Sequence, residues 1–112
     1  MPFSPTTDES DPETAYLRVI ETFQDRHPEG DGEILERAYR LALRAHDGQT
    51  RKSGEPFITH PIAVTQILAD YGMDAPTLAA SFLHDTVEDT DVTLEEITSQ
   101  FGSEIAYLID GV

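Results

Sequence analysis

The residues best suited to chemistry lie in one short stretch, from Ser81 to Thr90, which places an imidazole and three carboxylates within six positions. On a helix, residues four positions apart share a face, so His84 would lie beside Glu88, and Asp85 beside Asp89. Acids gathered this closely repel one another unless a cation or bound protons neutralise them. A metal ion is the simplest neutralising group, because imidazole and carboxylate are both common metal ligands. The stretch therefore predicts a metal site at the end of a helix.

A further ligand has to come from another part of the chain, and His60 is the best candidate. Adjacent His84 and Asp85 can share one ion only if it lies off the side of their helix, where a second segment can approach. Two simpler interpretations stay open. Glu88 and Asp89 also fit a solvated helix end, and a lone histidine such as His84 is more often a packed core residue than a ligand.

Apolar residues that recur at helical spacing predict the elements that would hold these groups. The predicted ranges are 13–27, 32–47, 60–71, from 75 into the acidic stretch, 93–101 and 103–109. Phe82 and Leu83 would anchor the fourth helix in the core and so hold His84 and Asp85 rigidly at its end. No segment alternates polar and apolar residues for long enough to predict a sheet. The fold class is therefore all-α, a bundle of about five to six helices.

The segment between Asp47 and His60 lacks any period, because glycine, proline and polar residues interrupt it. A loop of this length in a small domain is usually functional, although a plain connection remains the alternative. Arg51 is suited to stack on a flat base, and Lys52 offers a point charge to a phosphate. Ser53 precedes a glycine, which lets a ligand approach the backbone closely. We expect these three residues to bind an anionic ligand.

The charge of the chain is divided between its two halves. The net charge is -15, and all seven lysines and arginines precede residue 53, whereas the remaining sixty positions hold eleven acids. This balance argues against binding to nucleic acid or an anionic membrane, since both need a basic surface. A phosphorylated ligand held between a metal ion and the Arg51-Lys52 pair would reconcile an acidic protein with an anionic ligand. The simpler alternative is that the acids only maintain solubility.

The 112 residues suit one domain of modest core. Residues 1–12 are rich in proline, acids and hydroxyl residues, and we expect a disordered acidic tail there, with the folded domain at 13–112. The chain has no cysteine, no secretory signal and no apolar run long enough to span a bilayer. A cytoplasmic protein is the expectation.

Two motifs in one register carry a resemblance to a known family. Residues 51–61 read RKSGEPFITHP and residues 83–90 read LHDTVEDT. With the flanking residues from 32 to 112, they resemble the N-terminal hydrolase domain of the RelA/SpoT family, whose members make and degrade the alarmone (p)ppGpp. A lone His-Asp pair is weak evidence, but the two motifs together are highly specific.

The resemblance implies a helical HD-type phosphohydrolase domain that binds Mn2+ and removes pyrophosphate from the 3′ position of (p)ppGpp, leaving GDP or GTP. In that family pattern, the metal ligands match His60, His84 and Asp85. The residues that orient and activate the attacking water match Glu88 and Asp89, and the nucleotide-binding loop matches Arg51, Lys52 and Ser53.

The family pattern contains a fourth metal ligand, an aspartate in a later segment, which these 112 residues do not include. We therefore expect a bundle that is incomplete at its C-terminal end. Two alternatives remain: an HD phosphohydrolase that acts on another nucleotide, and a regulatory remnant that binds a guanine nucleotide without hydrolysing it. In the family pattern, helices beyond these residues would cover an apolar face. Without them we expect that face to be exposed and the chain to self-associate through Ile105, Ala106, Leu108 and Ile109.

Overall fold

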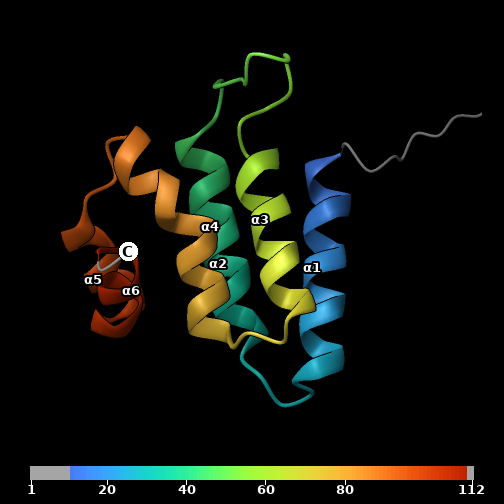
Figure 1. The fold of residues 1–112 in the computed structure, drawn as a ribbon. Helices are drawn as coiled ribbons and strands as arrows, with labels where there is room; N and C mark the ends of the chain where they lie inside the picture. The colour runs from blue at the N-terminus through green and yellow to red at the C-terminus, as the bar shows by residue number, and fades with distance from the viewer. Residues whose placement is uncertain (1–10, 111–112) are drawn as a thin grey trace, which may run out of the picture.

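The structure, a computed structural model, describes residues 11–110 (Figure 1). These residues form six helices and no strand, with one isolated antiparallel bridge between Thr50 and Pro56. The helices are α1 (Pro12–Arg26), α2 (Gly32–Ala45), α3 (Thr59–Asp70), α4 (Ala75–Asp89), α5 (Leu94–Phe101) and α6 (Ser103–Asp110). The prediction of an all-α bundle is confirmed.

The first four helices lie side by side, and α5 and α6 form a separate pair beyond α4 (Figure 1). α4 is the central element, because it packs against α2, α3 and α6. The long loop between α2 and α3 and the C-terminal end of α4 lie at the same end of the bundle (Figure 1). The topology thus brings the two motifs of the sequence to one end of the molecule.

Side-chain caps fix where several helices begin. Asp11, Asp31, Asp74 and Thr93 each accept a hydrogen bond from a backbone N–H of the first turn of α1, α2, α4 and α5. Such a bond satisfies one of the donors that a helix start leaves without a partner. Thr93 and Glu96 also form the predicted reciprocal capping box.

An aromatic cluster joins α1, α2 and α4 in the core. The rings of Tyr16 and Tyr39 stack with centroids 4.0 Å apart, and Phe82 packs against both at 6.1 and 5.8 Å. Burial raises the pKa of Tyr16 to about 12 and also raises the pKa of Tyr39. Both phenols therefore stay neutral at ordinary pH. Because Phe82 is fully buried, α4 is fixed immediately before its chemically interesting residues.

An ion pair connects α1 to α2 beside this cluster. Arg40 donates two hydrogen bonds to the carboxylate of Glu13, at 3.0 and 2.8 Å. These bonds hold the pKa of Glu13 below its ordinary value and raise the pKa of Arg40. α2 itself also places acids and arginines three and four positions apart, where ion pairs could form. Of those, only the one between Arg40 and Glu36 is formed, at 3.7 Å.

Several boundaries differ from the prediction by one or two residues. Asp11 and Pro12, assigned to the tail, instead start α1 as its cap and its first residue, while residues 1–10 lie outside the described part. α2 ends at Ala45 rather than at residue 47. α3 begins at Thr59, so His60 lies inside its first turn and not at the cap position. Pro61 is the third residue of α3 and still lies in its first turn, where the missing N–H needs no partner, which permits this earlier start.

At the end of the bundle away from the long loop, two side chains at the C-terminal end of α1 contact the C-terminal end of α3 and the residues just after it. Arg26 donates a hydrogen bond to the carbonyl oxygen of Asp70 at 2.6 Å, and the His27 ring lies 2.9 Å from the carbonyl oxygen of Gly72. The side chain of His27 is half-buried against the ring of Phe23. It thus serves to connect α1 with the end of α3.

The four α6 residues expected to be open to water are not exposed. Ile105, Ala106 and Ile109 are buried and Leu108 is partly buried, because α6 folds back onto α4 and α5. Large exposed apolar side chains lie mainly on α3 and just after it, at Val64, Ile67, Tyr71 and Met73, with Leu17 on α1 and Tyr107 on α6. Self-association of the chain stays a prediction. No helix among residues 11–110 is both long enough and apolar enough to cross a bilayer.

Candidate metal and nucleotide site

His84 and Asp85 lie in the last turns of α4, where the helix leaves the core. Phe82 and Leu83, immediately before them, are completely buried, whereas Glu88 at the end of the same helix is exposed. α4 therefore acts as a rigid support with a fixed inner part and a solvent-facing end. This arrangement matches the prediction that packing would hold the candidate ligands in place.

The carboxylate of Asp85 lies between two imidazole rings. One of its oxygens is 3.7 Å from Nε2 of His60, and the other is 3.4 Å from Nδ1 of His84. The side chains of His60 and His84 are 42% and 38% exposed, and that of Asp85 is 23% exposed. The structure thus brings the three predicted metal ligands together from α3 and α4, in a position that solvent can reach.

The residue types of this group suit a divalent cation, but the directions of the three side chains do not yet form a binding site. Two imidazoles and one carboxylate are a mixed donor set that first-row transition metals accept. In the structure, however, each imidazole faces a different oxygen of Asp85, and within residues 11–110 no three histidine or acidic side chains converge to enclose an ion. The group therefore offers the right donors, and binding would require them to turn toward a common point.

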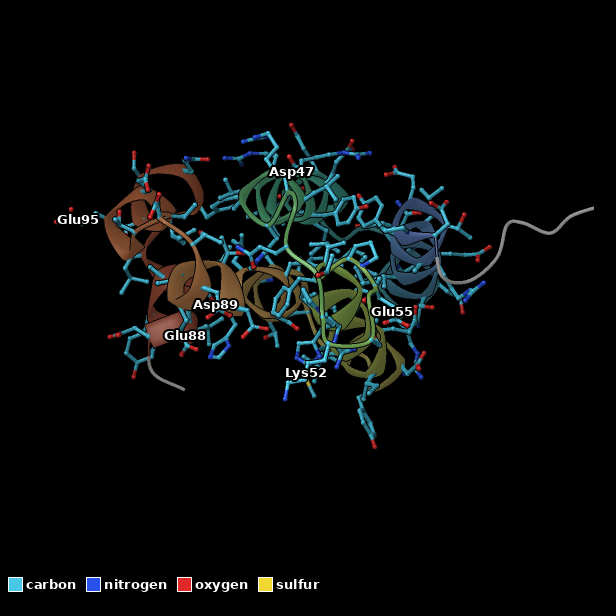
Figure 2. All side chains as sticks on the ribbon, turned by 90° about the horizontal axis from the view of Figure 1, so that it is seen from above. Asp47, Lys52, Glu55, Glu88, Asp89 and Glu95 are labelled. Carbon is cyan, nitrogen blue, oxygen red and sulfur yellow. The ribbon has the colours of Figure 1, made fainter. Side chains whose placement is uncertain are left out.

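Glu88 and Asp89 extend from the C-terminal end of α4 into solvent. Figure 2 shows both side chains at the rim of the bundle, on the side away from α1. The backbone carbonyl of Asp89 accepts a long hydrogen bond, 3.4 Å, from Nε2 of Gln49 in the α2–α3 loop. The end of α4 is thus in direct contact with the loop, although both carboxylates remain free to meet a ligand.

Backbone hydrogen bonds give the α2–α3 loop a defined shape. Arg51 N donates to Glu55 O and Gly54 N donates to Arg51 O, both at 2.8 Å. Phe57 N donates to Gln49 O at 2.9 Å. Gly54 has φ of +95°, a conformation that disfavours any residue with a side chain. The basic residues of the loop therefore stand on an ordered turn.

The structure places Arg51 on a different side of α3 from the candidate metal ligands. Arg51 lines a cavity of about 360 Å3 between α1 and α3, together with Arg18 and Glu55, and its guanidinium lies 3.9 Å from the Glu55 carboxylate. Figure 2 shows Glu55 on the side of the loop that faces α1, and Lys52 nearer to Glu88. Lys52 and Ser53 are exposed.

His60, His84 and Asp85 line a second cavity, of about 410 Å3, between α3, α4 and α6. Its other walls are mainly apolar and were not identified from the sequence: Pro61, Val64, Leu68, Thr77, Ala80, Ser81, Leu108 and Ile109. The signal that could have indicated them is the spacing of His60, Val64 and Leu68, because residues four apart share one strip of a helix. The proposed metal group thus borders an apolar pocket.

His46, at the C-terminal end of α2, has a buried side chain. The structure shows its ring 3% exposed, with Nδ1 3.1 Å from Gln49 Oε1 and Nε2 3.2 Å from Thr86 Oγ1. Thr86 directly follows Asp85 in the chain, so His46 lies immediately behind the candidate ligands.

The sequence pattern of the HD domain family matches residues 38–112 of this chain. This range covers most of the chain and includes both motifs. The chain belongs to the HD domain family. This assignment agrees with a helical bundle in which histidine and aspartate from two helices meet at one surface.

Relatives of this HD domain are RelA/SpoT proteins, so the family resemblance is confirmed. A GTP pyrophosphokinase of Streptomyces coelicolor is 59% identical over 78 residues, which is 70% of this chain and 9% of the relative. A guanosine-3′,5′-bis(diphosphate) 3′-pyrophosphohydrolase of Vibrio cholerae is 54% identical over 80 residues, 71% of this chain and 11% of the relative. The bifunctional (p)ppGpp synthase/hydrolase SpoT of Escherichia coli is 49% identical over 95 residues, 85% of this chain and 13% of the relative. The chain therefore spans about a tenth of the length of these relatives.

Proposed function

We propose that this HD domain takes part in the hydrolysis of the 3′-pyrophosphate of (p)ppGpp, with a divalent cation, as part of a longer catalytic domain. The observation that carries the proposal is the contact of Asp85 with His60 and His84, at 3.7 and 3.4 Å. Relatives named as a 3′-pyrophosphohydrolase and as a bifunctional synthase/hydrolase support the choice of substrate.

His60, His84 and Asp85 are the residues that would hold the cation, and we propose Mn2+ because it accepts both imidazole and carboxylate ligands. A bound divalent cation would supply Lewis-acid stabilisation of the charge that develops on the phosphoryl group. The partial burial of Asp85 keeps its carboxylate between the two rings and limits competition from water.

Glu88 and Asp89 are the proposed residues that orient the attacking water and accept its proton. Their exposure at the end of α4 leaves both carboxylates accessible to a substrate, and one helical turn separates Glu88 from His84. Removing the charge of Glu88 while keeping its shape, by Glu88→Gln, should lower turnover by about a hundredfold in the catalytically complete protein. Retention of full activity would remove Glu88 from this role.

Arg51, Lys52 and Ser53 are the proposed nucleotide contacts. Lys52 and Ser53 are exposed on an ordered turn, which supports their availability to a ligand. Arg51 faces the cavity beside α1 in this structure, so its participation requires that its side chain leave Glu55. The pair at 3.9 Å is solvent-exposed and would cost little to separate.

A second candidate function is nucleotide binding without hydrolysis. One observation favours it: within residues 11–110, no three histidine or acidic side chains converge on a single ion. Such a domain would recognise a guanine nucleotide through the loop and regulate the rest of a longer protein.

Two measurements on one sample separate the candidates. Calorimetry with ppGpp, in the presence and absence of Mn2+, would measure binding, and release of pyrophosphate would measure turnover. Hydrolysis of ppGpp in preference to GTP, deoxynucleoside triphosphates and cyclic nucleotides supports the proposed function. Binding without release supports the regulatory alternative. Preferential turnover of another nucleotide would assign this HD domain to a different substrate class.

A further inference from the structure

His46 occupies the junction of three parts of the molecule: the end of α2, the α2–α3 loop and the last turns of α4. Its ring is bound at both nitrogens, to Gln49 of the loop and to Thr86 of α4. It also packs against Phe57, at 4.7 Å between ring centroids, and Phe57 in turn packs against His60 at 6.0 Å. One buried side chain is thus in contact with the loop and, through Phe57, with a proposed metal ligand.

The partners of His46 determine which of its nitrogens carries the proton. Nε2 of Gln49 donates to the carbonyl oxygen of Asp89, so Oε1 of the same amide is the atom that faces His46. A carbonyl oxygen only accepts hydrogen bonds, and Nδ1 of His46 must therefore carry the hydrogen. In the neutral ring, Nε2 then accepts from the hydroxyl of Thr86.

These bonds form a closed circuit between the loop and α4. The circuit runs from Thr86 through His46 and Gln49 to the backbone of Asp89, and so returns to the helix in which it started. Thr86 is completely buried, so its hydroxyl has no access to water if the bond to His46 is lost. A buried polar group without a partner is costly, which gives the circuit a strong preference for one geometry.

We propose that His46, protonated on Nδ1, is a positioning residue that fixes the α2–α3 loop against the ligand-bearing end of α4. It thereby sets the separation between Arg51-Lys52 and His84-Asp85. A nucleotide that contacts both groups benefits from a fixed separation, because its orientation is then established before reaction. The nucleotide part of this inference rests on the proposed function, whereas the ordering of the loop does not.

Hydrogen exchange of the loop amides tests the ordering directly. Thr86→Val keeps the shape of the side chain and removes the hydroxyl that binds His46. The matched control is Thr65→Val, since Thr65 is also completely buried and its hydroxyl has one partner, Ser81 Oγ at 2.8 Å. Exchange of the Arg51, Gly54 and Phe57 amides should rise at least tenfold in Thr86→Val and stay within twofold in Thr65→Val.

Thr86→Ser restores the hydroxyl and should return the loop amides to their original exchange rates. Equal exchange in Thr86→Val and Thr65→Val would overturn the proposal, because His46 would then affect only general stability. Long-range 1H–15N correlation spectra of the histidine rings provide a second readout. They should show His46 protonated on Nδ1, and a proton on Nε2 instead would contradict the proposed circuit.

Binding measurements separate this inference from the proposed function. If the original chain binds ppGpp, Thr86→Val should weaken that binding about tenfold while the affinity for Mn2+ changes less than twofold. Unchanged ppGpp affinity alongside faster loop exchange would overturn the nucleotide part. If neither the original chain nor the catalytically complete protein binds ppGpp, the proposed function fails, and the exchange and tautomer results still decide whether His46 orders the loop.

Discussion

Two sets of histidines lie at the same end of the bundle: the buried His46, and the exposed pair of His60 and His84. They differ in whether both ring nitrogens already have a partner within the protein. His46 is 3% exposed and both of its nitrogens face a hydrogen-bond partner. His60 and His84 are 42% and 38% exposed, and each faces only one oxygen of Asp85. Residue type alone therefore does not identify a ligand. The histidines with free nitrogens can bind an ion, and the fully bound one can only hold its surroundings in place.

This difference predicts that substitutions in the His60–Asp85–His84 group lower metal affinity, whereas substitution of His46 lowers folding stability. The largest effect is expected at Asp85. Asp85→Ala should weaken Mn2+ binding by at least about a hundredfold, because even supporting residues of metal sites typically contribute 10–100-fold. The free energy of unfolding without metal should change little, since Asp85 is partly exposed and lies in an acidic region. Calorimetric titration with Mn2+ and urea denaturation would measure the two quantities.

The matched control for this variant is Asp91→Ala, which removes an exposed acid beyond the end of α4. It should leave Mn2+ affinity within about twofold. Equal loss of affinity in both variants would mean that diffuse charge, and not the His60–Asp85–His84 group, attracts the cation.

The reverse behaviour is expected at the buried group. His46→Leu should lower the free energy of unfolding by about 2 kcal/mol, because it leaves the hydroxyl of Thr86 buried without a partner. Its effect on Mn2+ affinity should stay within a few-fold, since His46 is not a proposed ligand. Chemical denaturation of this variant, beside His27→Leu at the opposite end of the bundle, would check the result. If His46→Leu lost much of its Mn2+ affinity and kept its full folding stability, His46 would be a ligand and not a structural residue.

The third prediction concerns the side of α3 on which the nucleotide binds. Arg51→Ala should raise the KM for ppGpp by about tenfold and change kcat less, because the proposed contact of Arg51 is with the base, at a distance from the reacting phosphorus. Arg18→Ala is the control, since Arg18 lines the same cavity but lies outside the loop motif. Steady-state kinetics on the catalytically complete protein would give both constants. Equal effects of the two variants would place the ligand in the cavity beside α1.

The smallest effect is expected far from both groups, at the pair of Glu13 and Arg40. The pKa of Glu13 is lowered in the folded state, so its contribution to stability is present above about pH 4.5 and is lost as the pH falls through the lowered value. Both side chains are more than a third exposed, which limits this contribution to less than about 1 kcal/mol. The melting temperatures of the original chain and of Glu13→Gln should therefore differ slightly at pH 7 and converge below pH 4.

The helices could be predicted because their signals are local. Helical spacing of apolar residues located α1 to α6, and the predicted starts at residues 32, 75 and 103 agree with the structure. His60 was paired with Asp85 only through its residue type and the family motif, yet the two approach to 3.7 Å.

Features that depend on tertiary packing could not be predicted. The partner of His46 at Thr86 lies 40 positions away, and no periodicity connects them. The position of Arg51 beside α1 depends on how a loop without a period folds over α3. The burial of α6 was also missed, because amphipathic spacing shows that a helix has an apolar face but not which neighbour covers it.

The uneven distribution of charge has a kinetic consequence. Because no lysine or arginine follows residue 52, the part of the chain that carries His60, His84 and Asp85 presents a negative field to the solvent. Such a field accelerates the arrival of cations and slows the arrival of anions, over a range of about 8 Å at physiological ionic strength. A bound divalent cation would locally reverse this field. If the proposed cation and nucleotide bind as inferred, this field favours the arrival of the cation first and of the phosphorylated nucleotide after it.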